Sequence, residues 1–261
     1  MNCLIETALL THGLRSIANE ELAQSWHCPD AILAWVDRGE LKLGPIGEYL
    51  PFRERSEELI RIDCDHLEEA LQTGASGALT ASGTMAVCRR LDIPMAITCG
   101  MGGIGDLRGE ELCPDLPALM NIPVALISTS PKDMLDRPAT LDWLRRHGVH
   151  TAGEPCTGYL FCGEPVALEL PLSSCNNEAA VRRLTANGGL LLLNPIPEKE
   201  RVQDQSILAD AIKAGKQAEA EGHYYHPAAN GEIDRRTDGY SSRIQLESIQ
   251  QNYLLAKSIM D

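Results

Sequence analysis

The sequence has few aromatic residues and a shortage of basic ones. Phe, Trp and Tyr make up 4% of the 261 residues, which argues against both an RNA-stacking surface and a sugar-stacking cleft. The 23 Lys and Arg residues face 37 Asp and Glu residues, which gives a formal net charge of −14. Because nucleic-acid polymers need a basic surface, we do not expect one as a partner. A small phosphorylated ligand is compatible with this charge, since one or two cations and backbone amides suffice to hold it.

Long hydrophobic runs are also absent. No apolar segment approaches the ~20 residues that a membrane-spanning helix needs, so we expect no association with a membrane. Residues 3–10 are the longest apolar candidate near the start, but Glu6 interrupts them and no basic leader precedes them. They therefore do not match a signal peptide. We expect a cytoplasmic protein.

The nine cysteines lack the spacing of a zinc site or a disulfide framework. None stands in a C-x-x-C pair, and Cys156 and Cys162 are the two that lie closest in sequence. Both kinds of site show tighter spacing. Reduced, mostly buried thiols fit a cytosolic protein.

Short apolar runs alternate with helical stretches along the chain. This alternation is typical of strands that are connected through helices, and it predicts an α/β fold. The chain is 44% hydrophobic and shows no linker or repeat, so we expect a single domain over residues 1–261. We expect strands at residues 3–10, 31–36, 40–43, 59–62, 95–99, 124–128 and 190–193, helices at residues 16–26, 65–72, 81–91, 139–146, 207–220 and 244–259, and a polar loop at residues 224–240.

A glycine-rich segment follows the strand expected at residues 95–99. Residues 100–105 satisfy the G-x-G-x-x-G pattern of dinucleotide-binding loops. That pattern also requires a helix that begins at once and an acidic residue at the end of the next strand. Here the next strand ends in Ser128-Thr129-Ser130, without a carboxylate. We therefore do not expect NAD, although backbone amides in such a loop can still approach a phosphate or a carboxylate.

Two charged residues stand where α/β enzymes place their chemistry. Lys132 follows the strand expected at residues 124–128, and open α/β sheets bind ligands beyond the carboxyl ends of their strands. Glu6 lies within an apolar strand. A buried lysine with a lowered pKa forms imines readily, and a buried carboxyl with a raised pKa suits proton transfer. From position alone, each residue is also compatible with a solvated surface.

Other polar residues leave their roles open. Asp115, Glu110 and Glu111 offer oxygen ligands for a divalent metal. Equally, they can cap a helix that begins near Pro114. His12 ends the first expected strand and receives no role here.

Several segments together resemble one known family in order and spacing. The most specific is Asn194-Pro195-Ile196-Pro197-Glu198 after an apolar strand, and the next is the lysine behind the glycine-rich loop. The other matching segments are residues 6–13, 77–85, 100–105, 131–136 and 188–189. Over nearly its whole length the chain is similar to the pseudouridine-5′-phosphate glycosidases, also called indigoidine synthase A-like proteins.

This resemblance implies a three-layer α/β/α domain with a central mixed sheet, and a homotrimer. It implies cleavage of pseudouridine 5′-phosphate to uracil and ribose 5-phosphate, with Mn2+ or another divalent metal. Lys132 would be the covalent nucleophile, Glu6 the proton donor and Glu111 the metal ligand. The substrate contacts implied are Arg61, Ala81, Gly102, Gly103, Cys113, Asp115, Asn194 and Gln245.

The sequence departs from the family pattern near the expected phosphate and metal. The loop before Glu111 is two residues shorter than in the family, and Gly105 or Asp106 stands where the family has a histidine. Arg61 replaces a lysine and Gln245 replaces an asparagine. The nucleophile is spared, so these changes bear on the substrate more than on the covalent chemistry.

Three alternatives stay open. A C-glycosynthase would use the same lysine and glutamate to join ribose 5-phosphate to another acceptor. A non-catalytic protein would bind the sugar phosphate without turnover. An NAD-dependent enzyme is the third and weakest alternative.

Overall fold

The computed structural model describes residues 2–105, 113–186, 188–222 and 225–260. Its centre is a ten-stranded sheet in the order β11-β10-β12-β8-β6-β1-β2-β5-β4, and β3 pairs with β2. Most neighbours run parallel, whereas β2 runs antiparallel to β3 and β5, so the mixed sheet is confirmed. The strands of this sheet are β1 (Cys3–Ile5), β2 (Leu33–Asp37), β3 (Glu40–Gly44), β4 (Ile60–Ile62), β5 (Gly77–Leu79), β6 (Met95–Ile97), β8 (Ala125–Ser128), β10 (His150–Gly153), β11 (Leu170–Pro171) and β12 (Leu190–Leu193).

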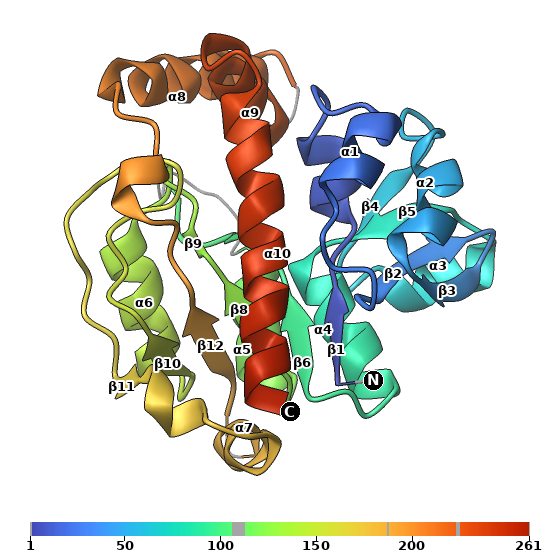
Figure 1. Cartoon of the computed structure of the whole chain (residues 1–261), viewed down its shortest axis with the longest axis vertical. Coiled ribbons are helices and arrows are strands. Elements are labelled where there is room, and N and C mark those ends of the chain that lie inside the picture. The colour runs from blue at the N-terminus through green and yellow to red at the C-terminus, as the bar shows by residue number, and fades with distance from the viewer. Residues whose placement is uncertain (1, 106–112, 187, 223–224, 261) are drawn as a thin grey trace.

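Helices cover both faces of this sheet (Figure 1). The long helix α10 packs against β1, β6 and β8 on one face, and α4 contacts the same strands from the other. The helices are α1 (Asn19–Ser25), α2 (Ile46–Arg53), α3 (Leu67–Thr73), α4 (Ala81–Arg90), α5 (Asp115–Asn121), α6 (Arg137–Arg146), α7 (Glu178–Thr185), α8 (Gln205–Ala220), α9 (Tyr225–Arg236) and α10 (Tyr240–Met260).

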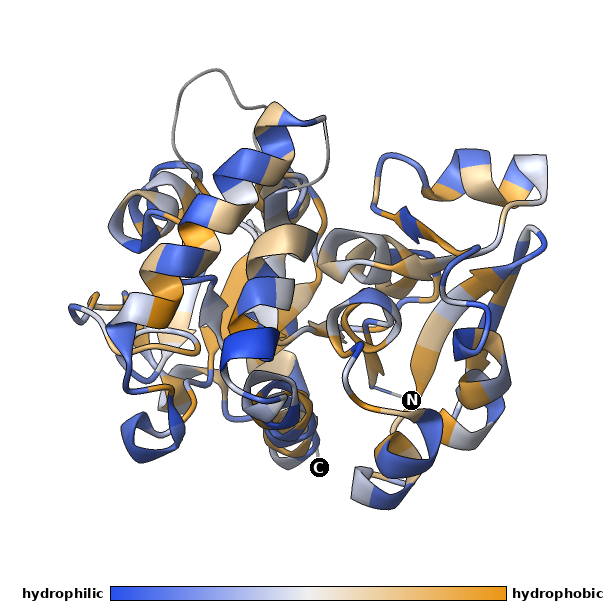
Figure 2. Cartoon of the chain, turned by 90° about the horizontal axis from the view of Figure 1, so that it is seen from above, coloured by the Kyte–Doolittle hydropathy of each residue, from blue (hydrophilic) through white to orange (hydrophobic). Residues whose placement is uncertain are grey.

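The run of four leucines in β12 shows why the central strands are apolar throughout. Leu190 and Leu192 belong to the hydrophobic core beneath α10. Leu191 and Leu193 belong to a second core beneath α4. Because side chains alternate between the faces of a strand, a strand covered on both faces has no polar side. Figure 2 shows these hydrophobic strands between helices whose outer faces are hydrophilic. The predicted three-layer α/β/α architecture is confirmed.

The first strand is shorter than the sequence predicts. It ends at Ile5, and a π-helical turn over Leu9–Gly13 replaces the rest of the strand expected at residues 3–10. The buried Arg53 guanidinium stabilises this turn by donating to the carbonyl oxygens of Leu10 and Leu14 at 2.6 and 2.8 Å. The apolar residues of the segment are buried or half-buried, but the second half of the segment forms a turn.

The prediction of a loop at residues 224–240 is wrong, since helix α9 occupies most of this segment. Ala229 and Ile233, one helical turn apart, are buried against the core under α10. The Asp234 carboxylate then accepts hydrogen bonds from the hydroxyls of Ser241 and Ser242 at the start of α10, at 3.0 and 2.7 Å. Charged and small residues between these anchors hide the helical pattern in the sequence.

All nine cysteines are free, and five of them are buried. Within the described residues, no helix combines the length and the apolar character required to cross a membrane.

Candidate active site

The predicted residues meet beyond the carboxyl ends of the central strands. Glu6 directly follows β1 and Thr98 directly follows β6. Lys132 follows the short strand β9 (Ser130–Pro131), which pairs with β7 (Gly100–Met101) of the glycine-rich loop. Parallel strands bring these ends to one edge of the sheet. A single cavity is lined by six of the predicted residues, namely Glu6, Arg61, Ala81, Asp115, Lys132 and Gln245.

The Glu6 side chain is buried, with 6% of its surface exposed. Burial raises its pKa to about 7, and the nearby Asp115 charge acts in the same direction. A hydrogen bond from the Thr98 hydroxyl to Glu6 Oε1, 2.7 Å long, opposes this rise, as do the charges of Arg61 and Lys132. The carboxyl group is thereby poised to give or take a proton near neutral pH.

The Lys132 amine belongs to the same cavity and does not point into bulk solvent. Its backbone N–H donates to the Met101 carbonyl oxygen at 3.2 Å, which ties the lysine segment to the glycine-rich loop. Burial lowers the pKa of the amine, and the positive charge of Arg61 lowers it further, whereas Glu6 and Asp115 oppose the shift. A lysine with a lowered pKa has a larger neutral fraction, and only the neutral amine adds to a carbonyl group.

Asp115, the first residue of α5, connects two elements of the site. Its Oδ2 atom accepts a hydrogen bond from the Gly102 N–H at 2.8 Å, and its Oδ1 atom accepts one from the Ser82 N–H at 3.2 Å. The Gly102 amide, predicted to contact the substrate, thus donates to this carboxylate. A side chain at Gly102 would collide with the Cys113 thiol, and one at Gly103 would lie 2.6 Å from Thr140 Oγ1. Both glycines therefore permit close packing behind the cavity.

Arg61 and Ala81 form the end of the cavity that best suits an anion. Arg61 is exposed on the edge strand β4, and no other described residue engages its guanidinium in a hydrogen bond or ion pair. Ala81 begins the ten-residue helix α4, whose cap is the Thr80 hydroxyl that accepts from Gly83 N–H at 3.3 Å. The N–H groups of Ser82 and Gly83 already donate to Asp115 and Thr80, so the Arg61 guanidinium is the group that makes this end suitable for a phosphate.

Of the last two predicted contacts, Gln245 lines the cavity, whereas Asn194 is not among the described residues that line it. Gln245 Oε1 accepts a hydrogen bond from the Tyr159 hydroxyl at 2.9 Å, and its Nε2 donates to the Ser241 carbonyl oxygen at 3.1 Å. Asn194 is outside the set of cavity-lining residues in the described chain. Its Nδ2 donates to Asn252 Oδ1 at 3.0 Å, and the Asn252 amide in turn donates to the Thr98 carbonyl oxygen at 2.7 Å.

Sequence reasoning did not find Thr98, Tyr159, Asn230 and Asn252. The place of Thr98 directly after an apolar strand was the one usable signal. Asn230 lines the cavity from α9, in the segment predicted as a loop. Tyr159 comes from an irregular segment, and Asn252 from the middle of α10, where no local pattern marks them.

The predicted metal ligand, Glu111, lies outside the described residues. In the part of the chain that the structure describes, no three His, Cys, Asp or Glu side chains converge as metal ligands. Both oxygens of the nearby Asp115 carboxylate already accept backbone hydrogen bonds. The described donors therefore do not by themselves form a divalent-metal site.

Comparisons of sequence support one family. The family described as indigoidine synthase A like protein matches residues 4–260. A pseudouridine-5′-phosphate glycosidase from Methylobacterium nodulans is 28% identical, over 98% of this chain and 81% of the relative. A protein of the same name from Petrotoga mobilis is 26% identical, over 98% of this chain and 89% of the relative.

Solved structures share the fold. An indigoidine synthase A-like protein from Thermotoga maritima superimposes with a TM-score of 0.79 at 21% identity, over 98% of this chain and 91% of that one. The prealnumycin C-glycosynthase AlnA, solved in complex with ribulose 5-phosphate, gives a TM-score of 0.78 at 22% identity with the same coverage. At these identities the likeness shows the fold alone.

Proposed function

This chain belongs to the indigoidine synthase A-like protein family, and from that premise we propose that it reversibly cleaves pseudouridine 5′-phosphate to uracil and ribose 5-phosphate. The observation that carries the proposal is the shared cavity of Lys132 and Glu6. The pKa of the amine is lowered while that of the carboxyl is raised to about 7. An amine with an increased neutral fraction and a carboxyl that titrates near neutral pH are thus in one cavity.

The carbon–carbon bond of the substrate explains why a lysine is needed. No glycosidic heteroatom can be protonated into a leaving group, so the paired-carboxylate route of ordinary glycosidases does not apply. Glu6 instead protonates the ring oxygen as the sugar opens, which leaves C1′ electrophilic in conjugation with the uracil. The neutral Lys132 amine adds to C1′. The ammonium formed by this addition loses a proton to the Glu6 carboxylate, which passes it to the uracil carbon. The C–C bond then breaks, its electron pair stays with the base, and the lone pair of the lysine nitrogen forms the C=N bond.

The sugar is then held as an imine on Lys132, and water releases it as ribose 5-phosphate. Arg61 anchors the phosphate. Binding energy from this remote group helps to position C1′ against the amine. The water step regenerates the free lysine, so each cycle consumes one substrate and one water.

Borohydride trapping with ribose 5-phosphate, followed by peptide mass spectrometry, tests the proposal. The wild-type protein should gain a reduced pentose-phosphate adduct on Lys132. Lys132→Ala should lose both the adduct and turnover. Lys199→Ala, which removes a lysine whose side chain is 83% exposed, should retain both. Full turnover by Lys132→Ala would refute the assignment, and tight binding of ribose 5-phosphate without adduct or turnover in the wild type would instead support a non-catalytic binding protein.

A C-glycosynthase is the second candidate, and the state of Gln245 favours it. Its amide oxygen already accepts from Tyr159 and its amide nitrogen donates to Ser241, so fewer polar groups remain for the edge of a uracil ring. Incubation with ribose 5-phosphate and a panel of acceptors distinguishes the two functions. Product only with uracil supports the glycosidase, and product with other acceptors alone supports the glycosynthase.

We further propose a homotrimer and a Mn2+ ion bound through Glu111, which the resemblance implies, and a cytoplasmic location, which the spacing of the cysteines favours. Light scattering after size exclusion should give three times the 28.5 kDa chain mass. Removal of metal by a chelator and readdition of Mn2+ should lower and restore activity. Glu111→Gln should weaken this response.

A further inference from the structure

Tyr159 lines the cavity but takes no part in the proposed reaction steps. It lies in the irregular segment between β10 and β11 and is buried, with 3% of its surface exposed. Its ring rests directly on Gly100, another cavity residue. A Cβ atom at Gly100 would lie 2.6 Å from Tyr159 Cζ and 2.9 Å from its Oη. The absence of a side chain at position 100 is therefore what lets the ring occupy this place.

The Tyr159 hydroxyl is fixed from two other elements. It donates to Gln245 Oε1 on α10 at 2.9 Å and lies 3.2 Å from the Cys99 thiol after β6. Burial raises the pKa of the phenol well above its ordinary value, so the hydroxyl stays protonated and remains a donor. The ring is thereby held in one orientation.

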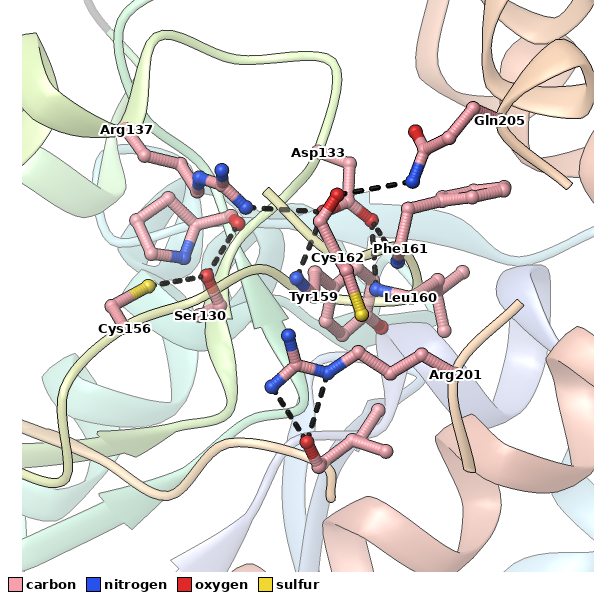
Figure 3. Close-up of polar contacts among 12 residues, drawn as sticks. Ser130, Asp133, Arg137, Cys156, Tyr159, Leu160, Phe161, Cys162, Arg201 and Gln205 are labelled. Atoms are coloured by element: carbon pink, nitrogen blue, oxygen red, sulfur yellow. Dashed lines mark hydrogen bonds and ion pairs between the residues drawn. The ribbon is translucent and has the colours of Figure 1, made fainter. Parts of the chain in front are cut away.

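The backbone at Tyr159 is held by the residue next to the nucleophile. The Asp133 carboxylate accepts hydrogen bonds from the consecutive N–H groups of Tyr159, Leu160 and Phe161 at 2.8, 2.7 and 3.0 Å (Figure 3). Arg137 lies 3.5 Å from the same carboxylate, whose side chain is 5% exposed. Three amides on one buried carboxylate fix the position of Tyr159 relative to Lys132.

Tyr159 lies away from the anion site because its ring contacts Gly100 and its hydroxyl lies beside Cys99, both after β6, which is four strands from β4 in the sheet. Arg61 comes from the edge strand β4, Glu6 from the central β1, and Lys132 follows β8, which lies farther along the sheet. With the phosphate of a pentose at Arg61 and C1′ at Lys132, Tyr159 and Gln245 are the cavity-lining side chains that remain to contact its aglycone on the side away from Arg61. Both side chains line this cavity, so their bulk bears on which ring fits beside the reacting carbon.

We propose that Tyr159 is a specificity-determining residue that restricts the aglycone to a small single ring, and that Asp133 is the positioning residue that holds Tyr159 in the cavity wall. This inference rests on the proposed function. Tyr159 acts by filling space next to the reacting carbon. Asp133 acts through the three backbone amides and does not touch the substrate.

The test compares uracil with 6-alkyluracils of increasing length as partners of ribose 5-phosphate, because these keep the reacting carbon and add only bulk. In the wild type, the kcat/KM for C–C bond formation should fall as the alkyl group lengthens. Tyr159→Ala should raise the ratio of 6-ethyluracil to uracil by about tenfold or more, and Asp133→Asn should raise it less. Tyr240→Phe and Asp142→Asn, which alter an exposed tyrosine and an exposed aspartate, should leave the ratio unchanged.

Two further measurements keep the outcomes separate. Calorimetric binding of the same uracils to the borohydride-reduced adduct gives the ratio without turnover, and Tyr159→Leu replaces Tyr159→Ala if the alanine variant does not fold. If the wild type forms no adduct on Lys132, the proposed function fails. Two results would overturn the role of Tyr159 if the adduct forms normally in all variants. One is an unchanged ratio of 6-ethyluracil to uracil, and the other is that no uracil binds to either the wild type or the variant.

Discussion

The Thr98 hydroxyl donates a 2.7 Å hydrogen bond to Glu6 Oε1, and both side chains are buried. Thr98 is itself held through its carbonyl oxygen, which accepts from the Asn252 amide at 2.7 Å. Asn194 completes this chain by donating to Asn252. Asn194 is thus connected to Glu6 through two intermediate residues, although it is not among the described residues that line the cavity. The hydrogen bond from Thr98 keeps the pKa of Glu6 from rising further under the effect of burial.

Thr98→Val should therefore move the pH dependence of activity. Without the hydroxyl, the pKa of Glu6 rises above about 7, so the protonated donor persists to higher pH. The falling limb of kcat/KM should shift upward by roughly one pH unit. Thr73→Val, at an exposed hydroxyl on α3, should leave the profile unchanged. An unshifted limb in Thr98→Val would show that this limb does not report Glu6.

Glu6→Gln should change stability in a pH-dependent way. The carboxyl pKa is 4.5 in the ordinary state and about 7 in the folded protein. A raised folded pKa contributes stability that is fully present below 4.5 and is lost as pH rises through 7. The glutamine variant lacks this loss. Between pH 4 and pH 8, its free energy of unfolding should therefore rise by about 2–3 kcal/mol relative to that of the wild type. Urea denaturation at both pH values measures the difference. Glu68→Gln, on an exposed side chain, should follow the wild type, and an equal loss in Glu6→Gln would contradict the prediction.

The layered fold and the positions of Lys132 and Glu6 beyond buried strands were predictable because their signals are local. Apolar runs mark the buried strands β6, β8 and β12, and Lys132 follows one of them at the distance expected of a catalytic loop. Glu6 stands out because burial of a carboxylate inside an apolar run costs free energy, which points to a functional role. The π-helical turn over Leu9–Gly13 was not predictable, because it depends on hydrogen bonds from Arg53, a residue far away in sequence.

The contact between Tyr159 and Gln245 in the cavity wall could not be predicted for the same physical reason. Tyr159 and Gln245 are 86 positions apart, and neither lies in a repeating pattern that points to the other. Helix α9 was missed because its buried positions, Ala229 and Ile233, are too few to give a clear period. Contacts between distant segments depend on the finished fold, so they are absent from any local window.

Asp115→Asn should destabilise the protein and lower turnover together. One carboxylate accepts the N–H groups of both Ser82 and Gly102. An asparagine would set its own amide hydrogens against one of these donors, which costs about 1–3 kcal/mol. Urea denaturation should show this loss, and Asp142→Asn on the surface of α6 should not. Stability equal to that of the wild type would mean that the connection between α4 and the glycine-rich loop contributes nothing.

Arg61→Met should shift the pH at which Lys132 becomes reactive. Burial and the Arg61 charge both lower the pKa of this amine, so removal of the guanidinium should raise it. A larger fraction of the amine is then protonated at a given pH. Borohydride trapping with glycolaldehyde, which has no phosphate, separates this effect from lost phosphate binding. The midpoint of adduct formation should move to higher pH by roughly half to one unit. Arg90→Met, at an exposed arginine of α4, should keep the wild-type midpoint. If the midpoint of Arg61→Met also stays in place, Arg61 acts on the phosphate alone and burial accounts for the reactivity of the lysine.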